Sequence, residues 1–414
     1  MNNTPGILLI ASIMLIPCVN SPASAQLSQL TENKYQLSDK DVQWIREATI
    51  QQLNGCRVEG ASGTWLHTPD GIGNYKALWT RDFYYMVEYA GDLMDPVEIR
   101  KSIYYLLQGQ REDGCIPDRV NIQGKPVYSP GPEQKPMADH ALDNGPFMAL
   151  LVCSYVNQFG DEALFRDVEE KLKIGLDFIN RDETGLVFND PDNPQCPYGF
   201  TDTVLKTGHL LFSSILYYHG CIEMQKLSEK YNVGDPSIYR KRGELIKKNI
   251  KTLKDKPSGM YLAADIDCRQ IDIWGSAYAV YVGLTSKAES KIVSTYLINN
   301  KDQIFMRGQI RHLPGSDTGW DKLFINIPEG KYQNGAYWAT PLAWVIPVIA
   351  QQDHKLASQI LQNVIEDFQK NGINECINTS YVNIPHYVAS ATNVYSLTIS
   401  SKSHGRNNIL VIPD

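Results

Sequence analysis

Six short polar segments recur along the chain at steps of about 60 residues, and each one stands before an apolar stretch. They are WTRD (79–82), LDNG (142–145), GFTD (199–202), DIWG (272–275), YQNG (332–335) and SATNVY (390–395). A step of this length accommodates one helical hairpin, with a long helix, a turn, a second long helix and a loop. The repetition therefore predicts six helical hairpins.

Two kinds of predicted helix alternate between these segments. One kind carries charge on one face only, as in 161–181, 235–253 and 353–370. The other kind is apolar or small nearly all round, as in 144–158, 206–219, 275–284 and 335–350. A helix that is apolar all round must be buried on every side. We therefore expect an all-α fold in which an outer ring of helices wraps an inner ring, an (α/α)6 toroid. An open α-solenoid is the alternative, but no capping repeat is visible.

The N-terminus has the pattern of a signal peptide. Its apolar run, residues 7–19, is shorter than the ~20 residues that a membrane-spanning helix needs, and a small-x-small cleavage signature, ASA, follows it. No later segment is long enough to span a membrane. We therefore predict a signal peptide at 1–25, a single domain at 26–414, and secretion or export to the periplasm.

Composition narrows the classes of partner. The net charge is −7 and no basic stripe is present, which argues against binding to nucleic acid or to an anionic membrane. The cysteines show no metal-ligand spacing, so we predict no metal and no cofactor. The acidic, turn-rich segment 189–195 would still permit a calcium ion. The sequence does not indicate the oligomeric state.

Parallel inner helices would bring the six polar segments to one rim of the toroid. Their free N–H groups and helix dipoles would then point into a common mouth. Hydrolysis of a glycosidic bond needs two carboxyl groups, one that protonates the leaving oxygen and one that activates water or attacks directly. Carboxylates near the predicted mouth are Asp82, Asp113, Asp143, Asp202, Asp272, Asp317, Asp321 and Glu375.

A family resemblance assigns roles to some of these carboxylates. The segments LWTRD, LDNG, YGFTDTVLKTG, GWD, YQNGAYW and GINECIN resemble the six-hairpin glycosidase superfamily, which includes glucoamylases, bacterial glycogen-debranching-type glucosidases and processing α-glucosidases. In glucoamylase-like members the general acid lies before the third inner helix and the general base before the last one. By position, the resemblance implies Asp202 as acid and Glu375 as base. The structural alternatives are a cap for a helix that begins at Val204 and a solvated loop glutamate.

Two other carboxylates remain candidates for the acid. The stretch DTGWDKL (317–323) resembles the segment that carries the acid in the processing-glucosidase branch, which makes Asp321 the second choice. It stands before the fifth predicted inner helix rather than before the third. Asp143 is the third choice. A helix N-terminus lowers the pKa of a carboxyl group, so Asp202 would need burial or a neighbouring carboxylate to act as an acid.

The remaining polar and aromatic residues of these motifs are predicted to hold the substrate. Arg81 and Asp82 offer a donor fork and an acceptor for two sugar hydroxyls. Lys206 and His209 would share a helical face with Asp202. The other candidates are aromatic rings that could stack on sugars or pack in the core, and polar hydrogen-bonding groups: Trp79, Trp274, Trp320, Trp338, Tyr198, Asp143, Asn144, His312, Gln333 and Asn334.

The sequence thus predicts a secreted, exo-acting glycoside hydrolase of the inverting type, acting on an oligosaccharide or other α-linked glucoside. Three other (α/α)6 chemistries stay open: unsaturated-uronide hydrolysis, polysaccharide lyase action and sugar epimerisation. Arg81, Arg119 and Arg311 could serve an acidic sugar in those reactions. A non-catalytic glycan-binding protein with the same fold is the alternative from another class.

Overall fold

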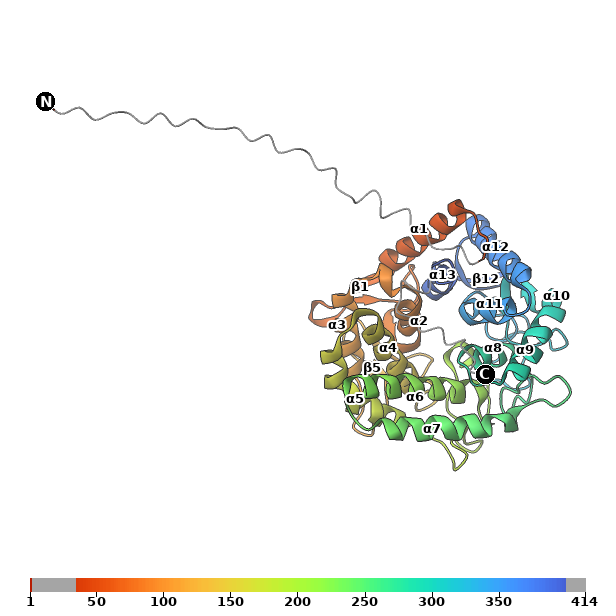
Figure 1. Ribbon diagram of the computed structural model, residues 1–414, viewed down its shortest axis with the longest axis horizontal. Helices are drawn as coiled ribbons and strands as arrows, with labels where there is room; N and C mark the ends of the chain where they lie inside the picture. The colour runs from red at the N-terminus through yellow and green to blue at the C-terminus, as the bar shows by residue number, and fades with distance from the viewer. Residues whose placement is uncertain (2–34, 400–414) are drawn as a thin grey trace.

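The inner and outer helices form two concentric rings (Figure 1). The computed structural model describes residues 35–399, together with Met1. The inner ring consists of α2 (Thr80–Ala90), α4 (Asn144–Phe159), α6 (Leu211–Tyr231), α8 (Ile273–Tyr281), α11 (Leu342–Ala350) and α13 (Val388–Tyr395). The outer ring consists of α1 (Asp39–Gly55), α3 (Pro96–Leu107), α5 (Glu162–Asp177), α7 (Pro236–Asn249), α9 (Lys287–Asn299) and α12 (His354–Asn371).

The inner ring is closed. Each inner helix contacts the next one along the chain, and α13 contacts α2. The outer helix α1 packs on α13, so the first helix of the described chain covers the last. This arrangement confirms the (α/α)6 toroid and rules out an open solenoid.

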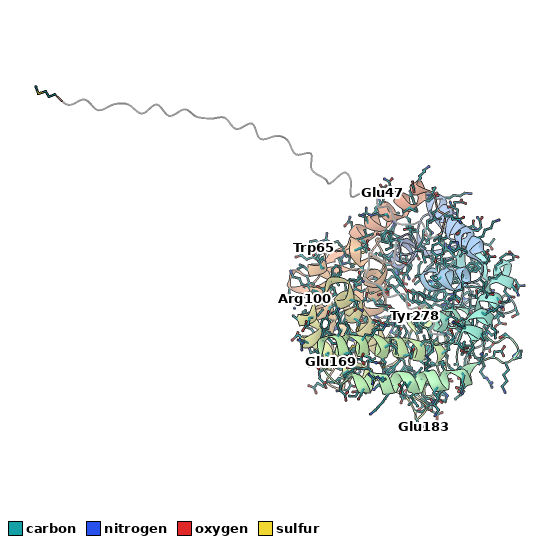
Figure 2. All side chains as sticks on the ribbon, in the orientation of Figure 1. Glu47, Trp65, Arg100, Glu169, Glu183 and Tyr278 are labelled. Atoms are coloured by element: carbon teal, nitrogen blue, oxygen red, sulfur yellow. The ribbon has the colours of Figure 1, made fainter. Side chains whose placement is uncertain are left out.

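Burial separates the two rings as their sequences predict. In α11 every residue from Leu342 to Ile349 is buried. In α5 and α12 the buried residues lie along one stripe, because the opposite face is charged. Figure 2 shows Tyr278 of α8 at the centre of the ring, whereas Glu47 and Glu183 lie at its periphery.

The two rings also differ in how their helices begin. Every outer helix has a side chain that caps its first turn: Ser38, Asp95, Asp161, Asp235, Ser286 and Asp353. Among the inner helices of the described chain, only α8 has such a cap, from Asp272. The polar residues at the other inner helix starts are therefore free for other contacts.

Short antiparallel strands connect the loops on this rim. The strand orders are β1–β2, β3–β4–β5, β6–β7 and β12–β11–β10–β9–β8. Their bounds are β1 (Arg57–Glu59), β2 (Trp65–His67), β3 (Ala77–Trp79), β4 (Arg119–Asn121), β5 (Pro126–Val127), β6 (Phe188–Asn189), β7 (Gly208–His209), β8 (Phe305–Met306), β9 (Gln309–Arg311), β10 (Tyr337–Trp338), β11 (Asn374–Asn378) and β12 (Tyr381–Pro385). Most pairs are local hairpins, whereas β3–β4, β9–β10 and β10–β11 join segments that are far apart in sequence.

The predicted starts of the third and fifth inner helices are wrong. A 3-10 turn at Gly199–Thr201 is followed by an isolated bridge at Val204 and by β7, so that α6 begins only at Leu211. Lys206 and His209 therefore do not share a helical face with Asp202. In the fifth hairpin, β10 stands between YQNG and α11, because apolar periodicity alone does not separate a short buried strand from a buried helix.

Several predictions concern features outside the helical rings. The predicted signal peptide lies outside the described residues, apart from Met1. Within residues 35–399, no helix is long and apolar enough to cross a membrane, and no three His, Cys, Asp or Glu side chains form a metal-binding group. The cysteines of the described chain are all buried free thiols: Cys56, Cys115, Cys153, Cys196, Cys221, Cys268 and Cys376.

The close packing of the rings leads to a prediction for Gly145 of α4. A Cβ atom at this position would lie 2.4 Å from the backbone oxygen of Gly175 in α5. Gly145→Ala should lower the free energy of unfolding by about 1–3 kcal/mol, because backbone cannot move away as a flexible side chain can. Gly243→Ala in α7 is the control, since its Cβ would have ordinary contacts no closer than 3.5 Å. That variant should gain up to about 1 kcal/mol. Urea unfolding measures both, and equal effects would contradict this packing.

Candidate active site

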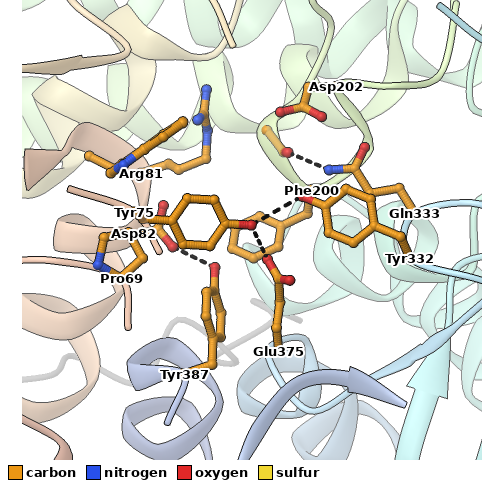
Figure 3. A pocket seen from close by; sticks show the side chains of 12 residues that line it. Pro69, Tyr75, Arg81, Asp82, Phe200, Asp202, Tyr332, Gln333, Glu375 and Tyr387 are labelled. Carbon is orange, nitrogen blue, oxygen red and sulfur yellow. Dashed lines mark hydrogen bonds between the residues drawn. The ribbon is translucent and has the colours of Figure 1, made fainter. Parts of the chain in front are cut away.

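A polar pocket with an empty volume of about 350 Å³ lies on the rim where the inner helices begin (Figure 3). Its walls come from the segments before α2, α6, α11 and α13. The lining residues are Pro69, Tyr75, Trp79, Arg81, Asp82, Gly199, Phe200, Asp202, Tyr332, Gln333, Glu375 and Tyr387. The rim predicted from the six polar segments is therefore the place where carboxyl, guanidinium and aromatic groups meet.

Glu375 enters the pocket from β11, the strand before the last inner helix. Its side chain accepts two hydrogen bonds, from the Tyr75 hydroxyl to Oε1 at 2.8 Å and from Asn383 Nδ2 to Oε2 at 2.6 Å. Asn383 lies on β12, opposite Cys376. Burial raises the pKa of Glu375 to about 8, although both hydrogen bonds favour the ionised form.

Asp202 enters from the opposite side of the view in Figure 3, directly after the 3-10 turn. Gln333 fixes this turn: its Nε2 donates to the carbonyl oxygen of Gly199 at 3.0 Å, and its Oε1 accepts from the backbone N–H of Thr203 at 2.8 Å. Burial raises the pKa of Asp202 to about 7, and the nearby Arg81 guanidinium opposes this shift. Asp202 is not an N-cap, which corrects the structural alternative considered above.

Arg81 and Asp82 lie in the first turn of α2 and have different surroundings. The Tyr387 hydroxyl donates to Asp82 Oδ1 at 2.5 Å, and burial raises the pKa of Asp82 to about 6. Arg81 is paired with two buried aspartates: Nη2 lies 2.6 Å from Asp118 Oδ1, and Nε lies 3.2 Å from Asp143 Oδ2. The positive charge of Arg81 is therefore neutralised behind the pocket wall.

Aromatic rings complete the pocket. The hydroxyls of Tyr75 and Tyr332 lie 3.5 Å apart, and the ring of Tyr75 meets that of Trp79 edge to face. Phe200 packs edge to face on Trp338, which lies beneath the pocket. These rings offer apolar faces beside hydroxyl donors, a combination that suits a sugar ring.

Six of the residues predicted for catalysis or substrate binding line the pocket: Asp202, Glu375, Trp79, Arg81, Asp82 and Gln333. Asp143 and Asn144 lie directly behind it, in contact with Arg81. Asp321, the second choice for the acid, is exposed and is not among the lining residues.

The other predicted substrate-binding residues have structural contacts away from the lining. The ring of Tyr198 stacks on Phe212, and Trp274 stacks on His312. Lys206 is buried over the ring of Trp320. These side chains do not line the pocket because they fill the centre of the toroid or the space beneath its loops.

Two further predicted residues hold loops together. Asn334 accepts a hydrogen bond from the backbone N–H of Trp320 at 2.7 Å. His209 on β7 lies between the carboxylates of Asp182 and Asp265, at 2.7 Å from each. Both contacts link segments of the rim, and neither residue lines the pocket.

Several residues of the site were missed at the sequence level. Tyr75, Tyr387 and Asn383 lie outside the six polar segments, and Tyr332 was passed over within YQNG. Asp70 could have pointed to Tyr75, because an aspartate before GIGN is typical of a turn; its carboxylate accepts the N–H groups of Ile72, Asn74 and Tyr75. Nothing local signals Asp118.

Comparisons with known proteins agree with this architecture. The sequence matches no protein-family model and no curated protein. Among solved structures, it is similar to a GH63 mannosylglycerate hydrolase from Thermus thermophilus, in complex with Tris and D-glycerate, at a TM-score of 0.66 and 14% identity over 86% of this chain and 100% of that chain.

Rhamnosidases are similar as well. A rhamnosidase from Klebsiella oxytoca with rhamnose bound gives a TM-score of 0.63 at 14% identity, over 88% of this chain and 64% of that one. A GH78 family rhamnosidase of Bacillus sp. GL1 gives 0.58 at 13% identity, over 86% of this chain and 34% of that one. The chain thus has the six-hairpin (α/α)6 fold that these glycoside hydrolases share.

Proposed function

We propose that this protein is an exported, inverting glycoside hydrolase with Asp202 as the general acid and Glu375 as the general base. The observation that carries the proposal is the meeting of two buried carboxyls in one pocket, from the loops before the third and the last inner helix. Inverting and retaining hydrolysis both need such a pair, and the inverting assignment follows the resemblance to glucoamylase-like members. Export rests on the N-terminal segment alone.

The surroundings of Asp202 suit a proton donor. Its carboxyl is 8% exposed, and burial keeps it protonated up to a pH of about 7. A protonated carboxyl at this position can pass its proton to the leaving oxygen as the glycosidic bond breaks. The lining offers no other buried carboxyl on that side of Figure 3.

The surroundings of Glu375 suit a base. Two donors, Tyr75 and Asn383, hold its oxygens in fixed positions. Burial raises the pKa of Glu375 to about 8, and these two hydrogen bonds oppose that shift because they favour the ionised carboxylate. A carboxylate held in this way can take a proton from water as the water attacks the anomeric carbon.

The position of the pocket supports an exo mode. It lies at one end of a closed ring of apolar helices, whose side chains fill the space below it. It fits one end of a glycoside better than the middle of a polymer. We propose an α-linked glucoside or a related neutral sugar as the substrate, with Arg81 and Asp82 at its hydroxyls.

The surroundings of the arginines argue against an acidic sugar. Arg81 is neutralised by Asp118 and Asp143. Arg119 is bound to Asp118 and to two backbone carbonyl oxygens. Arg311 donates to the carbonyl oxygen of Asp317 and is not among the lining residues. A uronide hydrolase or a lyase would need an unpaired cation in the pocket to bind the sugar carboxylate, and none of these three arginines offers one there.

Two substrates with different leaving groups can separate the roles of Asp202 and Glu375. Asp202→Asn should lower kcat by about 10²–10⁴-fold on a disaccharide, because no proton reaches the leaving oxygen. On a glycosyl fluoride, whose leaving group needs no proton, this variant should keep most of its activity. Glu375→Gln should be inactive on both substrates.

Asp321→Asn is the matched control for these variants, because this aspartate is exposed and lies outside the lining. It should retain wild-type kcat and KM. Equal losses of Asp202→Asn on both substrates would contradict its role as acid.

The pH profile should be displaced to higher pH than that of ordinary carboxyls. Activity should fall on the alkaline side because Asp202 loses the proton that it must donate, and on the acidic side because the Glu375 base gains one. Burial raises these two pKa values to about 7 and about 8, so few molecules hold both groups in the active form at once, and kcat/KM should peak between about pH 7 and 8. Values of kcat/KM measured between pH 4 and 9 give both limbs. An alkaline limb that persists in Asp202→Asn would show that Asp202 is not the group that causes it.

Inversion predicts the anomer that is released first. Proton NMR during hydrolysis of an α-glycoside should show the β-sugar before mutarotation equilibrates the two forms. An initial α-sugar would mean a retaining double displacement, in which the second carboxylate is a nucleophile.

A further inference from the structure

A chain of four alternating charges lies behind the pocket wall. Arg119 Nη1 donates to Asp118 Oδ2 at 2.8 Å, and Asp118 Oδ1 lies 2.6 Å from Arg81 Nη2. Arg81 Nε in turn donates to Asp143 Oδ2 at 3.2 Å. The four side chains are at most 5% exposed except for Arg119, at 7%, and their formal charges cancel.

This chain of charges ends on the turn that carries Asp202. The same oxygen of Asp143 accepts the backbone N–H of Gly199 at 2.8 Å. Gly199 begins the 3-10 turn that leads to Asp202. Arg81 lies directly against this glycine, because a Cβ there would be 1.8 Å from Arg81 Nε.

Asp118 also fixes the backbone next to Arg81. Its carbonyl oxygen accepts the N–H of Thr80, the first residue of α2, at 2.9 Å. One residue thus holds both the start of α2 and the guanidinium that follows it. Asp118 is not itself among the lining residues, and it acts on the pocket through Arg81.

We propose that Asp118 is a positioning residue of the active site: through Arg81 and Asp143 it fixes the Gly199–Asp202 turn and the charged groups that face Asp202. This inference rests on the proposed function for the role of Asp202 as acid. The network itself stands on the contacts above.

The sign of the effect follows from the charges that face Asp202. Arg81 lowers the pKa of Asp202, whereas the charges of Asp118 and Asp143 raise it. Removal of the Asp118 charge leaves the Arg81 charge less compensated, so both changes lower the pKa of Asp202. Three other titratable groups also interact with Asp202: Cys196, Tyr332 and Glu375. Of these, Cys196 also interacts with Asp118, whose charge helps to raise the pKa of its thiol.

The test is a titration of Asp202 in full-length protein with ¹³Cγ-labelled aspartate. The Asp202 signal is the one that Asp202→Asn removes. Its midpoint should lie near 7 in the wild type and about one pH unit lower in Asp118→Asn, a variant that keeps the shape of the side chain. Asp143→Asn should shift the midpoint in the same direction, and this variant replaces Asp118→Asn in the titration if the latter does not fold.

Asp113→Asn is the matched control, because Asp113 is also paired with an arginine, Arg111 at 2.7 Å, but is half exposed. It should leave the midpoint unchanged. Arg119→Gln, which leaves the Asp118 charge less compensated, should raise the midpoint. An unchanged midpoint in Asp118→Asn and Asp143→Asn would overturn the inference.

Kinetics separate this inference from the proposed function. If Asp202 is the acid and Glu375 the base, the pH optimum of kcat/KM lies midway between their two pKa values, so in Asp118→Asn it should move to lower pH by half of the shift of the NMR midpoint. A shifted midpoint with an unmoved optimum would refute the role of Asp202 and leave the network standing. An unshifted midpoint in an enzyme that Asp202→Asn inactivates would refute the network alone.

Discussion

The rest of the structure depends on closure of the inner ring. Its helices are apolar nearly all round, so each one needs a neighbour on both sides, and the contact of α13 with α2 supplies the last. Once closed, the ring buries most of its length, and polar side chains inside it pair with one another, as His219 of α6 does with Tyr278 of α8. The pocket lies where the inner helices begin, and the loops on that rim hold the candidate site.

Capping explains why these loops are free to form a site. Asp143 precedes α4 but does not cap it; its carboxylate holds Arg81 and Gly199 instead. Asp82 lies in the first turn of α2 and accepts from Tyr387 of another hairpin. Side chains that would stabilise one helix end are used to join different hairpins, whereas the outer helices keep their own caps.

The sequence predicted what depends on local pattern. Apolar periodicity placed four inner helix starts close to their observed positions and brought Asp202 and Glu375 to one rim. It failed for α6 and α11, where strands stand between the polar segment and the helix. The roles of Tyr75 and Asp118 could not be predicted because each depends on a partner far away in sequence: Tyr75 meets Glu375, 300 residues later, and Asp118 meets Arg81. Asn383 is close to Glu375 in sequence, but their contact depends on the register of β11 and β12.

The charges of the residues that line the pocket also bear on the kind of substrate that we propose. Within the described chain, three carboxyls and one guanidinium line the pocket, and that guanidinium is already balanced by Asp118 and Asp143. Any further negative charge would face Asp82, Asp202 and Glu375 without a free cation. Binding of an ionised substrate carboxylate would therefore be unfavourable, whereas a substrate hydroxyl can donate a hydrogen bond to these oxygens. The burial that raises the pKa of the proposed acid, Asp202, thus belongs to a lining that is consistent with the neutral substrate proposed above.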